Sequence, residues 1–429
     1  MKLRLVLEHR FQRTPDGQVW SAMFPRPVWS RYLRVFSEVC ICARVREVPA
    51  VPAEMGRVTG EGVTFFGLPH YHGPWEYWRR RHEFRVAVRR IAEPGAACIV
   101  RVPGNVASEA IAALRRDGLP CAVEVVADPW DMFSPGSSTH PLRWFFRRMF
   151  THATRRQCAQ AQATLYVTEH ALQRRYPPGH APGMVTCGVS DVCLGDGAFV
   201  ACARTRDSFT RRPLRLISVG SFNLLYKAQD VLVNAFARAV KHGLDGRLTF
   251  VGDGIYRPRI EALVARHRVL EGRVEFLGQL RGGEAVFEAL DRSELFVLPS
   301  RQEGLPRAAL EAMARGLPCI GSHVGGFPEI LPEDAIVRPN DVKGLARCLL
   351  RLAADPDRLA AMSAQNLRRA ADFHAEKLAV RQNAFYEEVS RLFGDFWARR
   401  GHPGRKPSCA GPEPLSHSAG VLPGVEQVA

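Results

Sequence analysis

The most constraining feature of this sequence is a regular alternation of short apolar runs with longer helical patterns between residues 214 and 356. Runs such as LRLISVG at 214–220 and ELFVLPS at 294–300 are apolar almost throughout, which is typical of strands buried on both faces. Strands that alternate with helical segments of about 10–15 residues predict βαβ units and a parallel sheet. We therefore expect a Rossmann-like half with strands at 214–220, 247–254, 273–280, 294–300 and 317–324. Its helices are expected at 229–243, 257–269, 283–292 and 306–315.

The N-terminal half repeats the same alternation less regularly. Strands are expected at 3–9, 38–45, 62–68, 97–103, 121–128 and 164–169. Helical patterns lie between them at 74–92, 105–117, 141–160 and 170–176. The segment 199–213 loses periodicity and predicts a linker, whereas 357–397 carries one long helical pattern.

A length of 429 residues allows two or three domains of ordinary size. We expect an α/β protein with two Rossmann-like domains that face each other across a cleft. The predicted parts are residues 1–205, residues 206–380, a helix at 381–400 that packs back on the N-terminal domain, and a disordered Gly/Pro/Ser-rich tail at 401–429.

Composition narrows the class of protein. The chain is 46% hydrophobic and 24% charged, close to the globular average, which excludes disordered, collagen-like and coiled-coil classes for most of its length. With 59 Lys and Arg against 43 Asp and Glu, the formal net charge is +16. Nucleic acid, an anionic membrane surface and a phosphorylated small substrate all remain as partners for such a charge.

The eleven cysteines argue against a disulfide framework and against a zinc site, because their number is odd and no C-x-x-C occurs. We expect most of them to be small core residues in a reducing compartment. The N-terminal MKLRLVLEHRF is too short and too charged for a signal peptide and predicts a first strand. No window approaches ~18 uninterrupted apolar residues, so we expect a cytoplasmic protein without a membrane span.

Ligands of parallel sheets bind outside the carboxyl ends of the strands, so the residues after each strand are the candidates for a site. The loop after 214–220 runs from Gly220 and Ser221 to Lys227, just before a helix, and its amides and ammonium group can hold a phosphate. The alternative is an ordinary loop with a solvated lysine. At Gly252-Asp253-Gly254, close backbone approach to a ligand and a tight turn that caps a helix are equally plausible.

A third place is SRQEGLPRAALEAMA at 300–314. Pro306 suits the first position of a helix, where its missing N–H costs nothing. Glu303 and Glu311 lie eight residues apart, and a carboxylate can accept two hydroxyl hydrogen bonds from a sugar or ribose. The alternatives are a helix-dipole partner for Glu303 and a solvated face for Glu311. The GGFPEI run at 325–330 either closes a sugar pocket or forms a strand-to-helix corner.

These runs carry a family resemblance. VGSFNLLYKAQDVL, VGDG, VEFLGQL and PSRQEGLPRAALEAMARGLPCIGSHVGGFPEIL, in this order and spacing, resemble the C-terminal domain of the retaining glycosyltransferases of family 4, also called glycosyl transferases group 1. The resemblance covers about 214–355 and extends more loosely over the N-terminal half. It implies the GT-B architecture, with an acceptor-binding N-terminal domain and a nucleotide-sugar-binding C-terminal domain.

The resemblance also implies residue roles. Lys227 would bind the donor diphosphate and Glu311 the ribose hydroxyls, while Glu303 would lie beside the donor sugar, with backbone at 304–306 meeting sugar and phosphate. The stretch 278–280 would line the base. Lys227 and Glu303 are the expected catalytic residues. The full set expected at the donor site is Gly220, Ser221, Lys227, Gly252, Asp253, Gly278, Leu280, Glu303, Gly304, Leu305, Pro306 and Glu311.

The sequence departs from the family pattern in three places. Many members carry Arg where this chain has Ser221, so the diphosphate would be held by Lys227 and helix-end amides, or another arginine such as Arg301 would reach in. The Gly-Gly loop of the N-terminal domain is missing, and Gly17 is the candidate for its place. The expected His is replaced by ADPWD at 127–131, where Asp128 and Asp131 are the acceptor-side candidates.

The implied reaction moves a sugar from a nucleotide diphosphate sugar to an acceptor hydroxyl with retention, in polysaccharide or glycolipid biosynthesis. The acceptor would be a saccharide or lipid-linked. No Asp-x-Asp metal motif stands at the expected place, so we expect no metal and no cofactor beyond the sugar nucleotide. A nucleotide-sugar epimerase or hydrolase on the same scaffold is the alternative. A nucleic-acid-binding protein would need a reader motif, and we find none.

Two basic segments stay outside this scheme. Arginines are concentrated at 79–90, and a helical stripe of apolar residues with interleaved arginines runs through 142–156. The stripe consists of Leu142, Phe145, Phe146, Met149, Phe150 and Ala153. It predicts either a core-facing helix with a solvated basic face or peripheral contact with an anionic membrane at its inner face.

Overall fold

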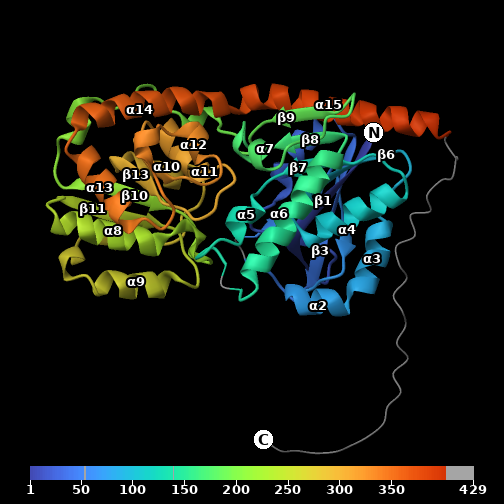
Figure 1. Ribbon diagram of the computed structural model, residues 1–429, viewed down its shortest axis with the longest axis horizontal. Coiled ribbons are helices and arrows are strands. Elements are labelled where there is room, and N and C mark those ends of the chain that lie inside the picture. Colours follow the sequence, from blue (N-terminus) through green and yellow to red (C-terminus); the bar gives the residue numbers. More distant parts are fainter. Residues whose placement is uncertain (53–54, 139, 402–429) are drawn as a thin grey trace, which may run out of the picture.

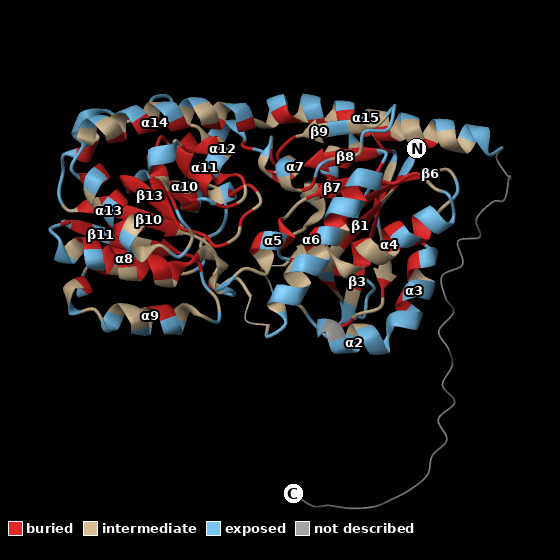
Figure 2. Cartoon of the chain, in the orientation of Figure 1, coloured by how far each residue is buried: buried red, intermediate tan, exposed pale blue. Residues whose placement is uncertain are grey.

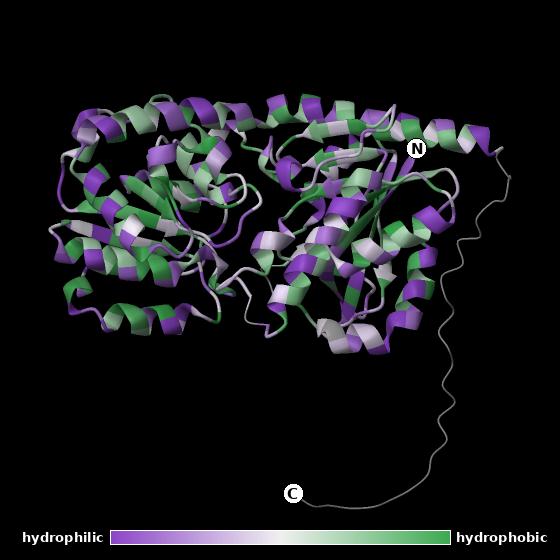
Figure 3. Ribbon diagram, viewed as in Figure 1, coloured by the Kyte–Doolittle hydropathy of each residue, from purple (hydrophilic) through white to green (hydrophobic). Residues whose placement is uncertain are grey.

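The computed structural model describes residues 1–52, 55–138 and 140–401, so the predicted tail at 401–429 lies outside the described residues except for Gly401. Two sheets with their own helices lie side by side, and two long helices run along the upper edge of both (Figure 1). Strands are mostly apolar and buried, whereas the outer faces of the helices are polar and exposed (Figures 2 and 3). This is the expected α/β architecture of two parallel-sheet domains, and the limits predicted for the domains stay a prediction.

The N-terminal sheet has nine strands within the described residues, in the order β4-β2-β1-β6-β7-β8-β9, with β3 between β1 and β5. The strands are β1 (Lys2–Arg13), β2 (Val19–Ser21), β3 (Glu38–Glu47), β4 (Gly56–Arg57), β5 (Val63–Leu68), β6 (Ala96–Val102), β7 (Ala122–Val125), β8 (Ala163–Tyr166) and β9 (Val185–Gly188). All pairs are parallel except those that β2 makes with β1 and β4. The apolar run of β1 is buried because β3 and β6 flank it and helices cover both faces.

The C-terminal sheet has six parallel strands within the described residues, in the order β12-β11-β10-β13-β14-β15. The strands are β10 (Leu214–Val219), β11 (Gly246–Val251), β12 (Val274–Phe276), β13 (Leu295–Leu298), β14 (Cys319–Ser322) and β15 (Ile336–Val337). Numbered from β10, this is the doubly wound order 3-2-1-4-5-6, so the order reverses between β10 and β13. That point is where a ligand crevice is expected.

Helices cover both sheets. In the N-terminal half they are α1 (Ser30–Leu33), α2 (Gly73–Arg79), α3 (Arg81–Arg89), α4 (Asn105–Arg116), α5 (Pro129–Met132), α6 (Arg143–Gln160) and α7 (Ala171–Arg175). In the C-terminal half they are α8 (Gln229–Lys241), α9 (Arg257–Ala265), α10 (Glu284–Asp291), α11 (Arg307–Ala314), α12 (Phe327–Ile330), α13 (Val342–Ala353) and α14 (Pro356–Ala370), followed by α15 (Ala375–Arg399). The helix expected at 74–92 is in fact two, because the chain turns at Arg80 between α2 and α3.

The long pattern at 357–397 is also two helices. α14 packs on the C-terminal half, whereas α15 lies against α1, β6 and β9 of the N-terminal sheet. Between them the backbone pairs with Leu194: its N–H donates to the carbonyl of Phe373 (3.0 Å), and its carbonyl accepts from Ala375 (2.8 Å). The helix breaks where the chain crosses from one domain to the other. Tyr386 on α15 then donates to the buried carboxylate of Glu124 on β7 (3.0 Å), which ties α15 to the N-terminal sheet.

The cysteines of the described residues are free thiols, and seven of them are buried. The buried thiols are Cys40, Cys42, Cys98, Cys121, Cys158, Cys319 and Cys348. They fill small core positions, as the sequence predicts, and Cys409 lies outside the described residues. Within the same residues, no helix combines the length and the apolar character needed to cross a bilayer.

Candidate active site

The candidate site is built from the loops that follow β10 and β13. These strands are hydrogen-bonded neighbours at the point where the strand order reverses, so their carboxyl ends open into one crevice. The loop after β10 carries Gly220 and Lys227, and the loop after β13 carries Ser300 and Glu303. The topology thus brings together two loops that the sequence indicates as separate candidates for a binding site.

Lys227 and Glu303 form an ion pair in this crevice. The Nζ atom of Lys227 lies 2.8 Å from Oε1 of Glu303, which also accepts a hydrogen bond from the hydroxyl of Ser300 (2.6 Å). Both side chains are largely buried, with 14% and 7% of their area exposed. Burial alone would lower the pKa of Lys227, but the charge of Glu303 and the neighbouring Tyr226 raise it overall, so the lysine is a fixed positive charge.

The backbone of the first loop aims Lys227 into the crevice. Ala228, the residue between Lys227 and α8, adopts a left-handed conformation with φ 57°, which residues with a Cβ rarely take. Such strain persists where the surroundings impose it and clusters at functional sites. Gly220 lies against the stem of the lysine, since a Cβ there would come within 3.1 Å of Cγ of Lys227.

The glycines after β11 and β12 serve loop packing. A Cβ at Gly252 would lie 2.2 Å from the carbonyl oxygen of Gly220, and the N–H of Gly252 donates to the carbonyl of Gly278 (2.8 Å). Asp253 accepts from the N–H of Gly254 (2.7 Å) and pairs with Arg257 at the start of α9 (2.9 Å). The segment Gly252-Asp253-Gly254 therefore forms a tight turn before α9, and its role in binding the donor stays a prediction.

Glu311 is a half-buried carboxylate on α11. It makes no side-chain hydrogen bond or ion pair with any residue in the described part of the chain, and burial raises its pKa although Arg307 acts in the opposite direction. An unpaired carboxylate in such a position can accept hydrogen bonds from two hydroxyl groups of a ligand. Pro306 precedes α11 as its N-cap with ψ 101°, so the prediction that it occupies the first helical position is wrong by one residue.

Arg301 does not replace the missing arginine. Its guanidinium pairs with both carboxylate oxygens of Asp230 on α8 (2.7 and 2.8 Å) and donates to Asn340 (2.6 Å) and to the carbonyl of Leu225. Only 6% of the residue is exposed. These bonds anchor the loop after β13 to the start of α8. Ser221 accepts from the N–H of Asn223 (3.1 Å), which shapes its own turn.

The N-terminal domain faces this crevice with the loop after β7. Asp128 accepts from the N–H of Trp130 (2.8 Å) as the N-cap of α5 and forms an ion pair with Arg175, so its carboxylate is used in holding the loop. Asp131 lies beside it, and burial together with the charge of Asp128 raises the pKa of Asp131 to about 6. The N–H of Gly325, from the C-terminal domain, donates to Asp131.

A cavity of about 460 Å³ opens between the two domains at this place. Asp128 and Asp131 line it from the N-terminal side, and His323, Gly325 and Glu329 line it from the C-terminal side. The structure therefore places both acceptor-side candidates at the domain interface, close to the loops that carry Glu303. Their role toward an acceptor stays a prediction.

The GGFPEI segment joins the domains. Gly326 donates to the carbonyl of Gly304 (2.7 Å), which seats the turn on the loop after β13. The carboxylate of Glu329 on α12 then accepts from the backbone N–H groups of Glu169 (2.7 Å), His170 (2.9 Å) and Ala171 at the start of α7. Glu329 thus supplies a contact between the domains that the sequence did not reveal, because the backbone groups that it binds lie about 160 residues away in the chain.

Gly17 lies elsewhere in the fold than expected. It occupies the turn between β1 and β2, with φ 79°, and its N–H donates to the carbonyl of Thr14 (2.9 Å). β1 therefore continues into an antiparallel hairpin and not into the strand-to-helix loop where a Gly-Gly motif would stand. The hairpin explains the glycine by its positive φ and gives no support to an acceptor role.

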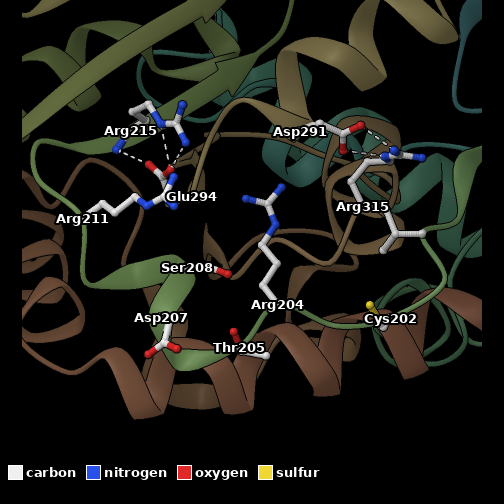
Figure 4. A pocket seen from close by; sticks show the side chains of 11 residues that line it. Cys202, Arg204, Thr205, Asp207, Ser208, Arg211, Arg215, Asp291, Glu294 and Arg315 are labelled. Atoms are coloured by element: carbon white, nitrogen blue, oxygen red, sulfur yellow. Dashed lines mark hydrogen bonds and ion pairs between the residues drawn. The ribbon is translucent and has the colours of Figure 1, made fainter.

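A second cavity, of about 470 Å³, lies at the amino ends of the strands of the C-terminal sheet (Figure 4). Its charges are used within the protein: Arg215 pairs with Glu294 and Arg315 with Asp291, while Arg204 donates to the carbonyls at the end of α10. Arg215 and Glu294 stand at the amino ends of β10 and β13, so this cavity is not the ligand crevice.

No cluster of three or more His, Cys, Asp or Glu side chains within residues 1–52, 55–138 and 140–401 could hold a metal ion. The expectation that the reaction needs no metal stays a prediction. Lys227 is a cationic group that this crevice can offer to an anion, beside the starts of α8 and α11.

Comparison with known proteins decides the family. Residues 213–355 match the family described as Glycosyl transferases group 1, and these residues contain every loop of the crevice on the C-terminal side. Over 94% of this chain and 99% of the relative, the sequence is 22% identical to Protein CapJ of Staphylococcus aureus. The C-terminal domain of this chain belongs to the group 1 glycosyltransferases. Nothing in these comparisons supports the alternative of an epimerase or a hydrolase.

Other relatives match a shorter part of this glycosyltransferase. It is 34% identical over 181 residues to N-acetyl-alpha-D-glucosaminyl L-malate synthase of Bacillus anthracis, a match that covers 41% of this chain and 46% of that protein. The chain therefore spans less than half of that relative's length.

Solved structures establish the fold of this glycosyltransferase as GT-B. Sucrose-phosphate synthase from Thermosynechococcus elongatus superposes with a TM-score of 0.64 over 93% of this chain and 100% of that chain, at 18% identity. Alpha,alpha-trehalose 6-phosphate synthase from Burkholderia multivorans gives 0.63 over 94% and 99%, at 14% identity. The predicted fold class is confirmed.

Proposed function

We propose that this glycosyltransferase transfers a hexosyl group from a nucleotide diphosphate sugar to an acceptor hydroxyl with retention of anomeric configuration. The observation that carries the proposal is the Lys227–Glu303 pair at the strand-order reversal, with the unpaired carboxylate of Glu311 on the adjoining helix. A fixed cation and a free carboxylate suit the two ends of a sugar nucleotide, its diphosphate and its ribose.

Lys227 acts on the leaving group. As the bond from the anomeric carbon to the diphosphate breaks, negative charge grows on the diphosphate oxygens, and an ammonium group already fixed in place stabilises that charge without reorganising. The N-termini of α8 and α11 add partial positive charge near the same place. Glu303 lies beside the sugar and keeps Lys227 oriented.

The other roles follow from the same placement. Glu311 accepts two hydrogen bonds from the ribose hydroxyls, and the backbone of Gly304, Leu305 and Pro306 meets sugar and phosphate. Gly278 and Leu280, which follow β12, line the base. The solved relative HepE of Anabaena is described in complex with UDP and glucose, at a TM-score of 0.54 and 14% identity, so a uridine nucleotide is the first donor to test.

Retention is assigned to attack on the same face from which the diphosphate leaves. The acceptor oxygen bonds to the anomeric carbon as the carbon–phosphate oxygen bond breaks, and the acceptor proton passes to the leaving phosphate. The proposal needs neither a protein nucleophile nor a metal. The proton and the electron pair of the broken bond both end on the diphosphate.

The acceptor is a growing saccharide or a glycolipid precursor. Relatives include a putative colanic acid biosynthesis glycosyltransferase of Escherichia coli and a phosphatidylinositol monomannoside mannosyltransferase of Corynebacterium glutamicum, each 33% identical over about a third of this chain. Asp131, at the interdomain cavity, is the acceptor-side residue that we assign to hydroxyl binding. A lipid-linked acceptor also fits peripheral contact with the anionic inner face of a membrane.

A panel of nucleotide sugars tests the proposal. The donor should raise the unfolding temperature of the protein, because a ligand that binds only the native state stabilises it. Incubation of that donor with and without a saccharide acceptor then separates transfer from hydrolysis and epimerisation. NMR of the product reports the anomeric configuration: an inverted product contradicts retention, and free sugar without transfer contradicts the reaction.

A further inference from the structure

Helix α2 exposes two tryptophans that no part of the described protein covers. Trp75 and Trp78 are 68% and 66% exposed, and their rings stack on each other with centroids 5.5 Å apart and planes at 19°. α2 lies at the lower edge of the N-terminal domain and is largely exposed (Figures 1 and 2). A tryptophan ring carries a large apolar area, so a paired patch on the surface indicates an interaction site.

Four arginines of α2, α3 and β3 have no partner among the described residues. Arg79 on α2, Arg89 and Arg90 at the end of α3, and Arg46 at the end of β3 make no side-chain hydrogen bond or ion pair with any described residue. Other arginines of this surface have acidic partners, since Arg81 and Arg85 share Glu109 and Arg80 pairs with Glu83. The uncompensated charge of the surface is therefore positive.

A cavity of about 570 Å³ lies at the base of this surface, between α3 and the ends of β3 and β5. Its walls are both apolar and cationic: Leu68, Val86 and Ala87 stand beside Arg46 and Arg90. The acids that line it are already paired, Glu83 with Arg80 and Glu47 with Arg13. An apolar floor under unpaired guanidinium groups suits an anionic group that is attached to a hydrocarbon chain.

The charge of this cavity acts on its own histidine. Burial, together with the positive charges of Arg44, Arg10 and Arg46, lowers the pKa of His70. The ring is thus neutral at physiological pH, and the field around it favours an anion.

The first turn of α6 repeats the pattern at the same edge of the domain (Figure 1). Leu142, Trp144 and Phe145 are 49%, 59% and 47% exposed, with Arg143 and Arg148 beside them. The apolar stripe predicted for this helix is divided: Phe146 and Phe150 are half-buried and pack against Phe133, with ring centroids 5.8 and 5.5 Å from the ring of Phe133. The remaining aromatic residues face outward.

We propose that α2, the cavity between α3 and the ends of β3 and β5, and the first turn of α6 form a docking face for an anionic phospholipid bilayer. Tryptophan prefers the membrane–water interface, where its ring is apolar on one side and hydrated on the other. Trp75 and Trp78 enter the interface, and Arg46 and Arg90 bind a lipid phosphate. Each basic residue near an anionic surface adds an electrostatic attraction, which salt screens. The inference deepens the proposed acceptor chemistry, because it holds the enzyme where lipid-linked acceptors are.

Vesicle binding by the full-length protein tests the docking face. Wild type should bind vesicles of phosphatidylcholine with about a third phosphatidylglycerol at least about tenfold more tightly than phosphatidylcholine alone, and salt should weaken binding. Trp75→Ser with Trp78→Ser should lower binding at least about tenfold. Val380→Ser, which removes an exposed apolar side chain from α15, should leave it unchanged.

A second set of variants tests the charge of the cavity. Arg46→Gln with Arg90→Gln should weaken binding to anionic vesicles several-fold, whereas Arg266→Gln with Arg268→Gln removes the same charge from an exposed site of the C-terminal domain and should have little effect. Glycerol 1-phosphate at millimolar concentration should not compete. Competition by this soluble phosphate would assign the cavity to a free phosphorylated ligand and would overturn the lipid assignment.

Fluorescence gives direct evidence of insertion. Lipids brominated near the headgroup should quench the tryptophan emission of wild type more strongly than that of the Trp75/Trp78 double variant, in which Trp144 is the tryptophan left on the docking face among the five that remain. Unchanged quenching in that variant, or a response to oligosaccharides without one to vesicles, would overturn the proposal. Transfer to a soluble acceptor should stay at the wild-type rate in the same variant, so failure of docking is distinguishable from failure of the proposed function.

Discussion

Lys227 and Glu303, which are 76 positions apart in the chain, meet at 2.8 Å in the crevice where the strand order of the C-terminal sheet reverses. Each comes from a loop that follows a central strand, and neither loop could hold its charge in this buried place without the other. A diphosphate that enters the crevice can share the ammonium group with Glu303, because Nζ has three N–H donors. The pair therefore keeps the cation in place before the donor arrives.

Replacing the lysine tests this role. Lys227→Ala should lower the rate of transfer at least about tenfold, which corresponds to roughly 1.4 kcal/mol of transition-state stabilisation. The loss should appear in kcat, because the charge develops as the diphosphate leaves. Steady-state kinetics with the identified donor measure it, and Lys241→Ala at the exposed end of α8 serves as the control. Wild-type kcat in Lys227→Ala would remove the lysine from the mechanism.

Glu311 should act in donor binding. Glu311→Gln should weaken the affinity for the nucleotide at least about tenfold, since an amide offers one acceptor atom where the carboxylate offers two. Burial raises the pKa of Glu311, so acidification should protonate it earlier than an ordinary glutamate and weaken nucleotide binding in wild type. Calorimetric titration at several pH values checks both points. A wild-type affinity in Glu311→Gln, or the same pH dependence in both proteins, would contradict the assignment.

Asp131 should make the fold less stable as pH rises. Its pKa in the folded protein is about 6, above the value of 3.8 for a free side chain, so folding favours the protonated form. The stabilisation is complete below pH 4 and is lost as pH rises through about 6. Asp131→Asn should remove this dependence and, at pH 7, raise the free energy of unfolding by up to ~3 kcal/mol, the equivalent of the pKa shift. Urea unfolding between pH 4 and 8 measures it. A parallel decline in both proteins would contradict the coupling.

Glu329 should hold the two domains together. Its carboxylate accepts from three backbone N–H groups of the N-terminal domain, and Glu329→Ala leaves those donors without a protein partner. We expect a larger radius of gyration by small-angle scattering and a several-fold loss of transfer. Glu333→Ala, an exposed acid a few residues further along the chain, is the matched control. If scattering and activity stay unchanged in Glu329→Ala, the contact does not control the domain arrangement.

The sequence alone predicts the strands of the C-terminal domain and their parallel pairing well, because these strands are apolar along their whole length and alternate with helices. The strand order does not follow from the apolar pattern, and the reversal between β10 and β13 in the structure makes the loops with Lys227 and Glu303 neighbours. The sequence indicates Gly252 and Gly278 as candidates for the donor site but does not show why glycine is needed there. In the structure both have positive φ values, which allow close contacts between loops.

Long-range polar contacts were beyond prediction. The guanidinium of Arg301 is taken up by Asp230 and Asn340, and nothing in the local sequence indicates that pairing. The hairpin around Gly17 pairs the end of β1 with β2, a strand of three residues that is too short for a periodic pattern. The helical pattern at 74–92 contains Trp75 and Trp78, but it does not indicate which of its side chains are buried. The structure shows that both rings are exposed.

The most direct test of the account is an equilibrium titration of the wild type and of Lys227→Ala with the nucleoside diphosphates of uridine, guanosine and adenosine. If Lys227 holds the donor diphosphate, one of them should bind the wild type with roughly micromolar affinity, and the same nucleotide should bind Lys227→Ala at least about tenfold more weakly, while Lys241→Ala should bind it as wild type does. Equal affinity in wild type and Lys227→Ala, or no binding of any of the three, would contradict the claim that this crevice is the donor site.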